Sequence, residues 1–191
     1  MPTPPRTSLA AIVAAGRAVL AREGMSGLTM QRVGEAVGVR APSLYKHVPS
    51  RSVLIRLVAE DLMDEVARRL DAAATTGDAR QDLRALAITL REFALNDRHG
   101  LDLLFTSLPA DAAPDTSTLA AAAGPVLRIA TELAGPDHGL DAARTVTAWA
   151  SGFLRMELSG DFQLGGDVSR AFEFGLQTLI TGLANGDTQR G

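Results

Sequence analysis

The sequence contains no cysteine, a single lysine and few aromatic residues. Without cysteine the chain can form neither disulfides nor thiolate metal sites, and it has no cysteine nucleophile. Aromatic residues make up only 4% of the chain, while alanine is abundant, a balance that favours helices over sheets. The absence of disulfides is compatible with the reducing cytoplasm, where we expect the protein to act.

Long apolar runs are also missing. The first residues, MPTPPRTSLAAIVAAGRAVLARE, imitate a signal peptide because the basic Arg6 precedes a short apolar run. Arg17 interrupts that run, and no apolar stretch approaches the ~20 residues that a membrane-spanning helix needs. We therefore expect a soluble protein with no membrane anchor and no membrane partner.

Positive charge is concentrated near the N-terminus. Residues 1–56 hold eight arginine or lysine residues and two glutamates, a net charge of +6, whereas the whole chain carries −3 and the remainder therefore −9. Such an asymmetry suggests a domain that binds a polyanion, joined to an acidic body. An ordinary solvated surface would give the same count, so charge alone leaves both interpretations open.

The spacing of the apolar residues predicts an all-α fold of about nine helices, because they recur at intervals of three and four and almost never alternate. Gly24 and Gly38 are predicted to end the first two helices. Thr29 and Ser50 are predicted to cap the second and the fourth. Gly124-Pro125 should bend or split the seventh. The predicted helices cover residues 8–23, 30–37, 41–48, 51–74, 79–96, 99–108, 118–133, 140–158 and 168–184.

Two short helices joined through Gly38-Val39 have the spacing of a helix-turn-helix, whose second helix enters the major groove of DNA. Gly38 supplies the permissive backbone of the turn. A small core should fix the two helices, formed by Val33, Val37, Val39, Leu44 and Val48. The sequence thus predicts a DNA-binding domain over residues 1–55 and a larger helical domain over residues 56–191.

The second of these short helices should present Ala41, Pro42, Ser43, Lys46 and His47 outward. Lys46, the only lysine, can donate to a guanine edge or to a phosphate, and Ser43 can meet either a base or a phosphate. The carbon atoms of Ala41 and Pro42 can contact a thymine methyl group. These residue types therefore point to double-stranded DNA as the partner.

The segment LTMQRVGEAVGVRAPSLYKHVPSRSVL, residues 28–54, resembles the DNA-binding region of the TetR family of bacterial regulators. The resemblance implies phosphate contacts for Tyr45, His47 and Arg51, and DNA contacts for Thr29 and Gln31. Tyr45 could instead pack between helices, and His47 could be a surface residue. The matching positions are Thr29, Val33, Gly34, Gly38, Val39, Leu44, Tyr45, His47, Arg51 and Leu54.

Two positions depart from the family pattern. Arg40 stands where a capping serine or threonine is common, so its helix loses a cap worth about 1 kcal/mol and gains a positive charge near the DNA backbone. Val48 stands where phenylalanine is common, which leaves a smaller core. Neither departure removes the resemblance, but both limit any prediction of the operator sequence.

A single helix-turn-helix reads few base pairs, so such proteins usually bind palindromes as homodimers. The resemblance implies an interface from the last two helices, although the same seam could be an intramolecular core. Its candidate residues are Ala143, Val146, Ala150, Leu154, Phe172, Leu176, Leu179 and Leu183.

The resemblance also implies a cavity for an unknown small-molecule effector, enclosed by the helices after residue 56. The candidate residues could equally be plain core or surface. They are Phe93, Leu104, Phe105, Leu127, Trp149, Phe153 and Met156, with Arg128, Arg155 and Glu157 as polar anchors.

The predicted function is a repressor that an effector releases from its operator; the alternative is a ligand-independent regulator, or an activator, on the same fold. An enzyme is not expected, because the sequence lacks a glycine-rich phosphate loop and the G-x-S-x-G and H-E-x-x-H motifs. His99 and His138 lack matched carboxylates, so we expect neither a metal nor another cofactor. A helical scaffold would leave Lys46, Tyr45 and Arg51 unexplained.

Overall fold

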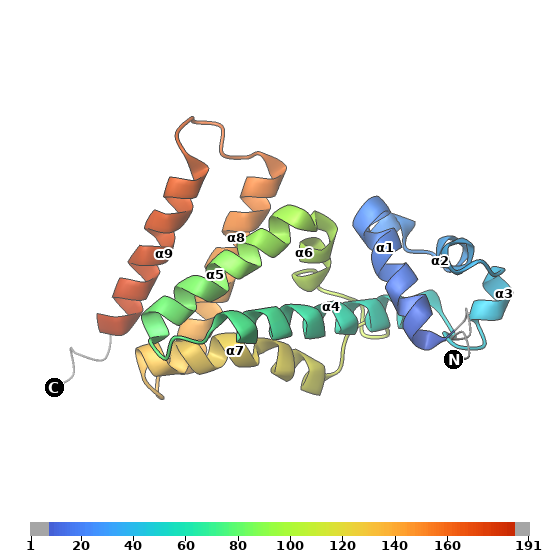
Figure 1. Cartoon of the computed structure of the whole chain (residues 1–191), viewed down its shortest axis with the longest axis horizontal. Helices are drawn as coiled ribbons and strands as arrows, with labels where there is room; N and C mark the ends of the chain where they lie inside the picture. The colour runs from blue at the N-terminus through green and yellow to red at the C-terminus, as the bar shows by residue number, and fades with distance from the viewer. Residues whose placement is uncertain (1–7, 186–191) are drawn as a thin grey trace. The chain divides into compact units, whose positions relative to one another are not determined.

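The computed structural model describes residues 8–185, which form nine helices and no strand, so the all-α prediction is confirmed. Most of the helices lie close to their predicted ranges. In chain order the helices are α1 (Leu9–Gly27), α2 (Met30–Val37), α3 (Ala41–Leu44), α4 (Arg51–Ala73), α5 (Ala79–Asn96), α6 (Arg98–Leu104), α7 (Thr116–Ala134), α8 (Gly139–Ser159) and α9 (Val168–Asn185) (Figure 1).

The chain divides into two compact units that share α4. The first unit contains the residues up to Glu65 together with Asp97–Leu119, and the second contains Val66–Asn96 together with the residues from Ala120 onward. In the first unit α6 packs on α1, an association that the sequence analysis did not predict. The predicted domain boundary at residue 55 stays a prediction, since it concerns independent folding rather than compactness.

The helix ends in the first unit follow local sequence signals. The Thr29 hydroxyl accepts from the Arg32 N–H at 3.2 Å, and the Ser50 hydroxyl accepts from the Val53 N–H at 3.2 Å, as predicted. Gly24 has a φ of 67°, which glycine adopts readily, and kinks α1 before its last residues.

Four helices differ from prediction. α1 continues past its predicted end before Gly24 to Gly27. α3 ends at Leu44, four residues before its predicted end, and hydrogen-bonded turns follow it, in which the N–H groups of His47 and Val48 both donate to the Leu44 carbonyl. α6 ends at Leu104, also four residues early. α7 is not split at Pro125 but continues through it as one helix. Pro125 is buried within α7.

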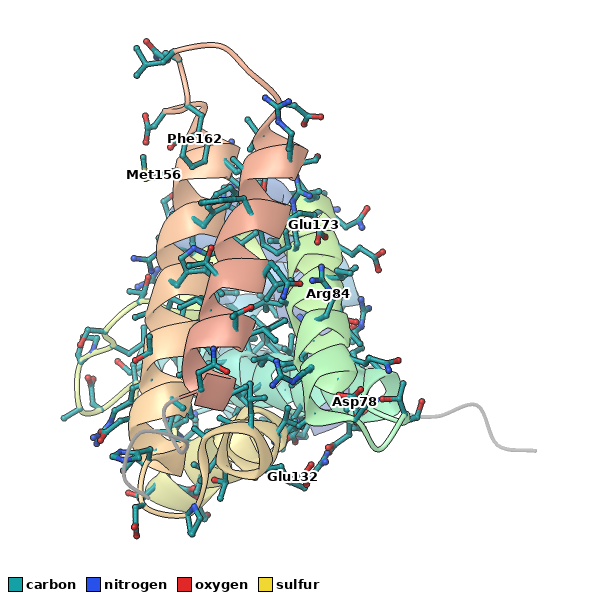
Figure 2. The ribbon with its side chains drawn as sticks, turned by 90° about the vertical axis from the view of Figure 1, so that its left-hand side faces the viewer. Asp78, Arg84, Glu132, Met156, Phe162 and Glu173 are labelled. Atoms are coloured by element: carbon teal, nitrogen blue, oxygen red, sulfur yellow. The ribbon has the colours of Figure 1, made fainter. Side chains whose placement is uncertain are left out.

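In the second unit α5, α8 and α9 pack on one another, with α8 and α9 side by side (Figure 1). Each contributes large buried side chains, including Leu83, Leu154, Phe172 and Leu176. Figure 2 shows Arg84 of α5 next to Glu173 of α9, and these two side chains form an ion pair. Small residues on α7 and α8, among them Ala130 and Ala142, join a second buried cluster.

Within residues 8–185, no helix has both the length and the hydropathy to cross a bilayer. The same residues contain no group of three or more histidine, cysteine, aspartate or glutamate side chains arranged to hold a metal ion.

Candidate DNA-binding site

The turn between α2 and α3 is built on a left-handed glycine. Gly38 has φ 75° and ψ 29°, and its N–H donates to the Glu35 carbonyl at 3.1 Å. The next N–H, of Val39, donates to the Gly34 carbonyl at 2.9 Å. These two bonds form a Schellman motif, which satisfies carbonyls that the end of the helix leaves unpaired. The motif directs the chain from α2 into α3.

Gly34 lets the two helices come close together. A Cβ atom added there would lie 2.9 Å from the carbonyl oxygen of Val39 and 3.3 Å from the amide nitrogen of Ala41. Both neighbours are backbone atoms of the turn, which cannot rotate away as a side chain can. Glycine at this position therefore sets the approach of α3 to α2.

The residues from Arg40 to His47, called the reading segment below, are anchored by one apolar side chain. Leu44 is fully buried, as is Val48 immediately after the segment. Tyr45 is 51% exposed, so its ring is not enclosed between helices. Ala41 is half-buried, and the remaining predicted DNA contacts of the segment are exposed, namely Arg40, Pro42, Ser43, Tyr45, Lys46 and His47.

Arg40 and Lys46 differ from the other cations of residues 8–56 in having no partner. Neither side chain makes a hydrogen bond or ion pair with any residue that the structure describes. The guanidinium groups of Arg17, Arg22, Arg32 and Arg56 lie 2.6–3.9 Å from carboxylate oxygens. The reading segment therefore presents two cationic side chains that no described carboxylate or carbonyl engages.

The predicted DNA contacts outside the reading segment are engaged within the chain. Gln31 is exposed and donates to Glu35 at 3.1 Å. Thr29 caps α2 through its hydroxyl. Arg51 donates from Nε to the Leu28 carbonyl at 2.7 Å and from Nη2 to the Met25 carbonyl at 2.6 Å. DNA contacts by these three residues stay predictions.

Two family models match the chain in succession. One, described as bacterial regulatory proteins of the tetR family, matches residues 12–58. The other, described as a tetracyclin repressor-like C-terminal domain, matches residues 83–179. The chain belongs to the TetR family. The resemblance found in residues 28–54 is therefore confirmed, and the protein is a TetR-family transcriptional regulator with a helix-turn-helix and a ligand-binding domain.

Individual members of the TetR family are similar to it over different lengths. An uncharacterized HTH-type transcriptional regulator of Mycobacterium tuberculosis is 30% identical over 166 residues, which are 82% of this chain and 73% of that protein. An HTH-type transcriptional repressor of Streptomyces coeruleorubidus is 32% identical over 95 residues, which are 50% of this chain and 34% of the repressor.

A solved structure of the family covers nearly the whole chain. It is a variant of TetR from Acinetobacter baumannii in complex with minocycline, with a TM-score of 0.69 and 25% sequence identity. The alignment covers 92% of this chain and 95% of that chain.

In this TetR-family protein the candidate effector residues differ in their burial, and the effector site stays a prediction. Trp149 and Phe153 lie together, with ring centroids 5.7 Å apart, and both contact Phe172. Phe93 is buried in the second unit, beneath the Arg69 guanidinium. Leu104 and Phe105 belong to the first unit and are half-buried, whereas Leu127, Arg128, Met156 and Arg155 are exposed.

Sequence reasoning named Glu157 as a polar anchor beside this aromatic cluster but missed its partner Arg91. Arg91 of α5 donates from Nε to Glu157 of α8 at 2.9 Å and from Nη2 to Ser169 of α9 at 3.0 Å. Its guanidinium also lies 4.8 Å from the centroid of the Phe172 ring. Hydrogen bonding to Glu157 raises the pKa of Arg91 above its usual value. No local pattern could have found Arg91, because its partners lie 66 and 78 residues away.

Most candidate interface residues are enclosed within the chain. These side chains face α5 and α7 of the same chain. A second copy of the chain would therefore have to contact other residues of α8 and α9. The interface itself stays a prediction. The buried residues are Ala143, Val146, Ala150, Leu154, Phe172 and Leu176, and the half-buried ones are Leu179 and Leu183.

Proposed function

We propose that this protein is a homodimeric, cytoplasmic repressor that binds a palindromic operator and leaves it when a small-molecule effector binds. One observation carries the proposal. Arg40 and Lys46 are the two cations of residues 8–56 without a partner, and both lie on the exposed reading segment after the helix-turn-helix turn. Unpaired cations at this place suit a groove lined by phosphates.

The reading segment supplies both kinds of contact that sequence-specific binding needs. Arg40 can bond a guanine through its planar fork, and Lys46 can donate to a guanine edge or a phosphate. The side chains of Pro42 and Ser43 offer an apolar contact and a hydroxyl to neighbouring bases. Tyr45 and His47, both exposed, are the proposed phosphate contacts.

The proposed dimer uses the outer surfaces of α8 and α9. We call this surface the Phe174 face, after a phenylalanine that is 75% exposed in the single chain. Its other members are small, which allows two helix pairs to approach closely. The face consists of Ala148, Gly152, Ala171, Phe174 and Thr178, all of them exposed.

The effector is proposed to act on the second unit, where the aromatic cluster of Trp149, Phe153 and Phe172 offers apolar surface beside the Arg91–Glu157 pair. The structural neighbour bound to minocycline supports a ligand of some kind. An effector that favours the conformation unable to bind DNA lowers operator affinity by the ratio of its affinities for the two conformations. DNA must weaken effector binding by the same factor.

The test is fluorescence anisotropy with DNA fragments adjoining the protein's own gene, at about 50 and 200 mM salt. Wild type should bind one fragment far more tightly than random DNA, and binding should weaken at the higher salt concentration. Lys46→Glu should abolish specific binding, because it replaces an unpaired cation with a charge that phosphates repel. Arg68→Glu is the matched control, since Arg68 is an exposed arginine of α4 outside the predicted DNA-binding domain.

Equal binding of wild type and Lys46→Glu to every fragment, followed by failure to select a site from random DNA, would contradict the proposal. A reporter gene fused to the bound fragment then separates the alternatives. Expression that rises when the gene for this protein is deleted supports repression, and expression that falls supports activation.

A further inference from the structure

Arg51, the first residue of α4, follows the helix-turn-helix and bonds to residues that precede it. Its Nε donates to the carbonyl of Leu28 at 2.7 Å, and its Nη2 donates to the carbonyl of Met25 at 2.6 Å. Both acceptors lie at the end of α1, where helix carbonyls lack partners within the helix. A cation there also interacts favourably with the negative end of the helix dipole.

These two hydrogen bonds join the residue that follows the DNA-reading elements to residues that precede them. Leu28 directly precedes the cap of α2, and Arg51 directly follows the cap of α4, so α2, the turn and the reading segment all lie between the joined ends. Leu28 is fully buried, which fixes the acceptor end to the core. The Arg51 side chain therefore links the two ends of the helix-turn-helix directly through hydrogen bonds.

A phosphate contact by Arg51, which the family resemblance implies, would compete with this arrangement. Two of the three guanidinium nitrogens are already engaged at short distances with carbonyls of the same chain. We propose that Arg51 is a positioning residue, which sets the orientation of the reading segment for base recognition instead of neutralising a phosphate. This inference rests on the proposed function, because positioning matters only if the segment reads DNA.

The chemistry of arginine makes the inference testable. Lysine keeps the charge that a phosphate contact requires, but its single ammonium cannot reproduce a planar fork that bonds two separate carbonyls. Arg51→Lys thus separates the two roles. Arg56→Lys is the matched control, because Arg56 lies five residues further along α4 and pairs with Glu60 instead.

The first measurement needs no DNA. Tyr45 is the only tyrosine in the chain and lies on the reading segment, so 3-fluorotyrosine labelling of the full-length protein gives one ¹⁹F NMR resonance from that segment. Arg51→Lys should shift, broaden or split this resonance while the helical circular dichroism stays at the wild-type level. Arg56→Lys should leave the resonance unchanged.

The second measurement uses the operator fragment and a random duplex. Arg51→Lys should weaken operator binding by at least about tenfold, leave binding to the random duplex unchanged, and keep the salt slope of log K. Arg51→Met should give the same slope, since no phosphate contact is lost. A wild-type resonance with wild-type operator affinity in Arg51→Lys would overturn the inference. So would a salt slope about one unit smaller in Arg51→Met, which marks a lost phosphate contact.

Loss of the folded state in Arg51→Lys would also overturn the inference, because Arg51 would then be a folding residue. Failure of the proposed function is distinguishable from all of these outcomes. If wild type binds no DNA specifically, the proposed function fails, and the ¹⁹F resonance still decides whether Arg51 orients the segment.

Discussion

Gly34 is the position where a single methyl group should do most damage to the helix-turn-helix. We expect Gly34→Ala to lower the free energy of unfolding by about 1–3 kcal/mol, because the new Cβ would meet the Val39 carbonyl oxygen at 2.9 Å. The backbone of the turn would have to move, so operator affinity should fall as well. Urea denaturation followed by circular dichroism measures the first effect, and anisotropy the second.

Gly182 provides the control for this substitution. It lies in α9 with no atom within 4 Å of an added Cβ, so the substitution changes helix propensity without a clash. We expect Gly182→Ala to raise stability by about 0.5–1 kcal/mol. If Gly34→Ala were as stable as Gly182→Ala, the turn would be able to adapt, and close approach would not explain the glycine.

At the level of single elements, Asp82 near the start of α5 should make the free energy of unfolding depend on pH in the acid range. Asp82 accepts hydrogen bonds from the Thr76 N–H at 2.9 Å, the Thr76 hydroxyl at 2.7 Å and the Gly77 N–H at 3.3 Å. These bonds favour the charged carboxylate, so they lower the pKa of Asp82, the Thr76 N–H contributing most. A pKa lower in the folded than in the unfolded chain stabilises the fold at higher pH.

We therefore expect the Asp82 contribution to be complete above about pH 4 and to disappear as the pH falls further, through the lowered pKa of the folded protein. Asp82→Asn should reduce stability at neutral pH and flatten the decline in the acid range. Urea denaturation between about pH 2 and pH 6 measures both effects. Asp64→Asn, at an exposed position of α4, should keep the wild-type profile; a wild-type profile in Asp82→Asn would contradict the prediction.

The contact between α5 and α8 makes a separate prediction about Arg91 and Glu157. Their side chains are only 17% and 13% exposed, so removal of one partner leaves a poorly solvated charge. We expect Glu157→Leu to destabilise the protein by about 1–3 kcal/mol. The double variant Arg91→Met with Glu157→Leu should recover most of that loss, since an apolar pair leaves no charge to solvate.

A double-mutant cycle by urea denaturation measures this coupling. If the two substitutions were simply additive, the ion pair would contribute nothing as a pair. The packing of Arg91 against the Phe172 ring would then account for its effect.

On the scale of the whole molecule, the Phe174 face should control the oligomeric state. We expect Phe174→Glu to weaken dimerisation by at least about tenfold, because a large exposed aromatic at the centre of an interface usually carries much of its binding energy. Sedimentation velocity over a range of concentrations measures the change. Operator binding should fall with it, since one helix-turn-helix reads only half of a palindrome.

Leu164 offers a matched control for the dimer prediction. It is a fully exposed apolar residue of the loop between α8 and α9, outside the Phe174 face. Leu164→Glu removes a similar exposed apolar group and should leave the dimer intact. If both variants dimerise like wild type, the dimer surface must lie elsewhere on the chain.

The parts of the fold that sequence predicted well depend on neighbouring residues. Thr29 caps α2 because its hydroxyl meets an N–H only three residues away, and Gly38 turns the chain because glycine adopts a positive φ readily. Sequence spacing did not predict where α3 ends, because regular helix stops at Leu44 and hydrogen-bonded turns continue to Val48. The spacing of apolar residues is similar in a helix and in such a series of turns.

The candidate sites show the limit of the same reasoning. The seam of α8 and α9 is apolar whether it faces a second copy or the rest of its own chain, and only the structure, in which α5 packs on both helices, shows that Leu154 and Phe172 are buried within one chain. The structure likewise shows that the Phe174 side chain is exposed. The bonds of Arg51 to the carbonyls of Leu28 and Met25 were also beyond sequence reasoning, because those partners lie 23 and 26 residues away.

By itself, the sequence determined the helical class, the helix-turn-helix and the family, because each depends on periodicity and on turn residues within a few positions of one another. Tertiary structure alone decided that Arg17 pairs with Asp61 and Glu65, which apolar surfaces are covered and which residues surround the aromatic cluster. Those properties depend on contacts between residues distant in the chain. For the cations, such contacts leave Arg40 and Lys46 unpaired beside the turn, while Arg51 is held by backbone carbonyls.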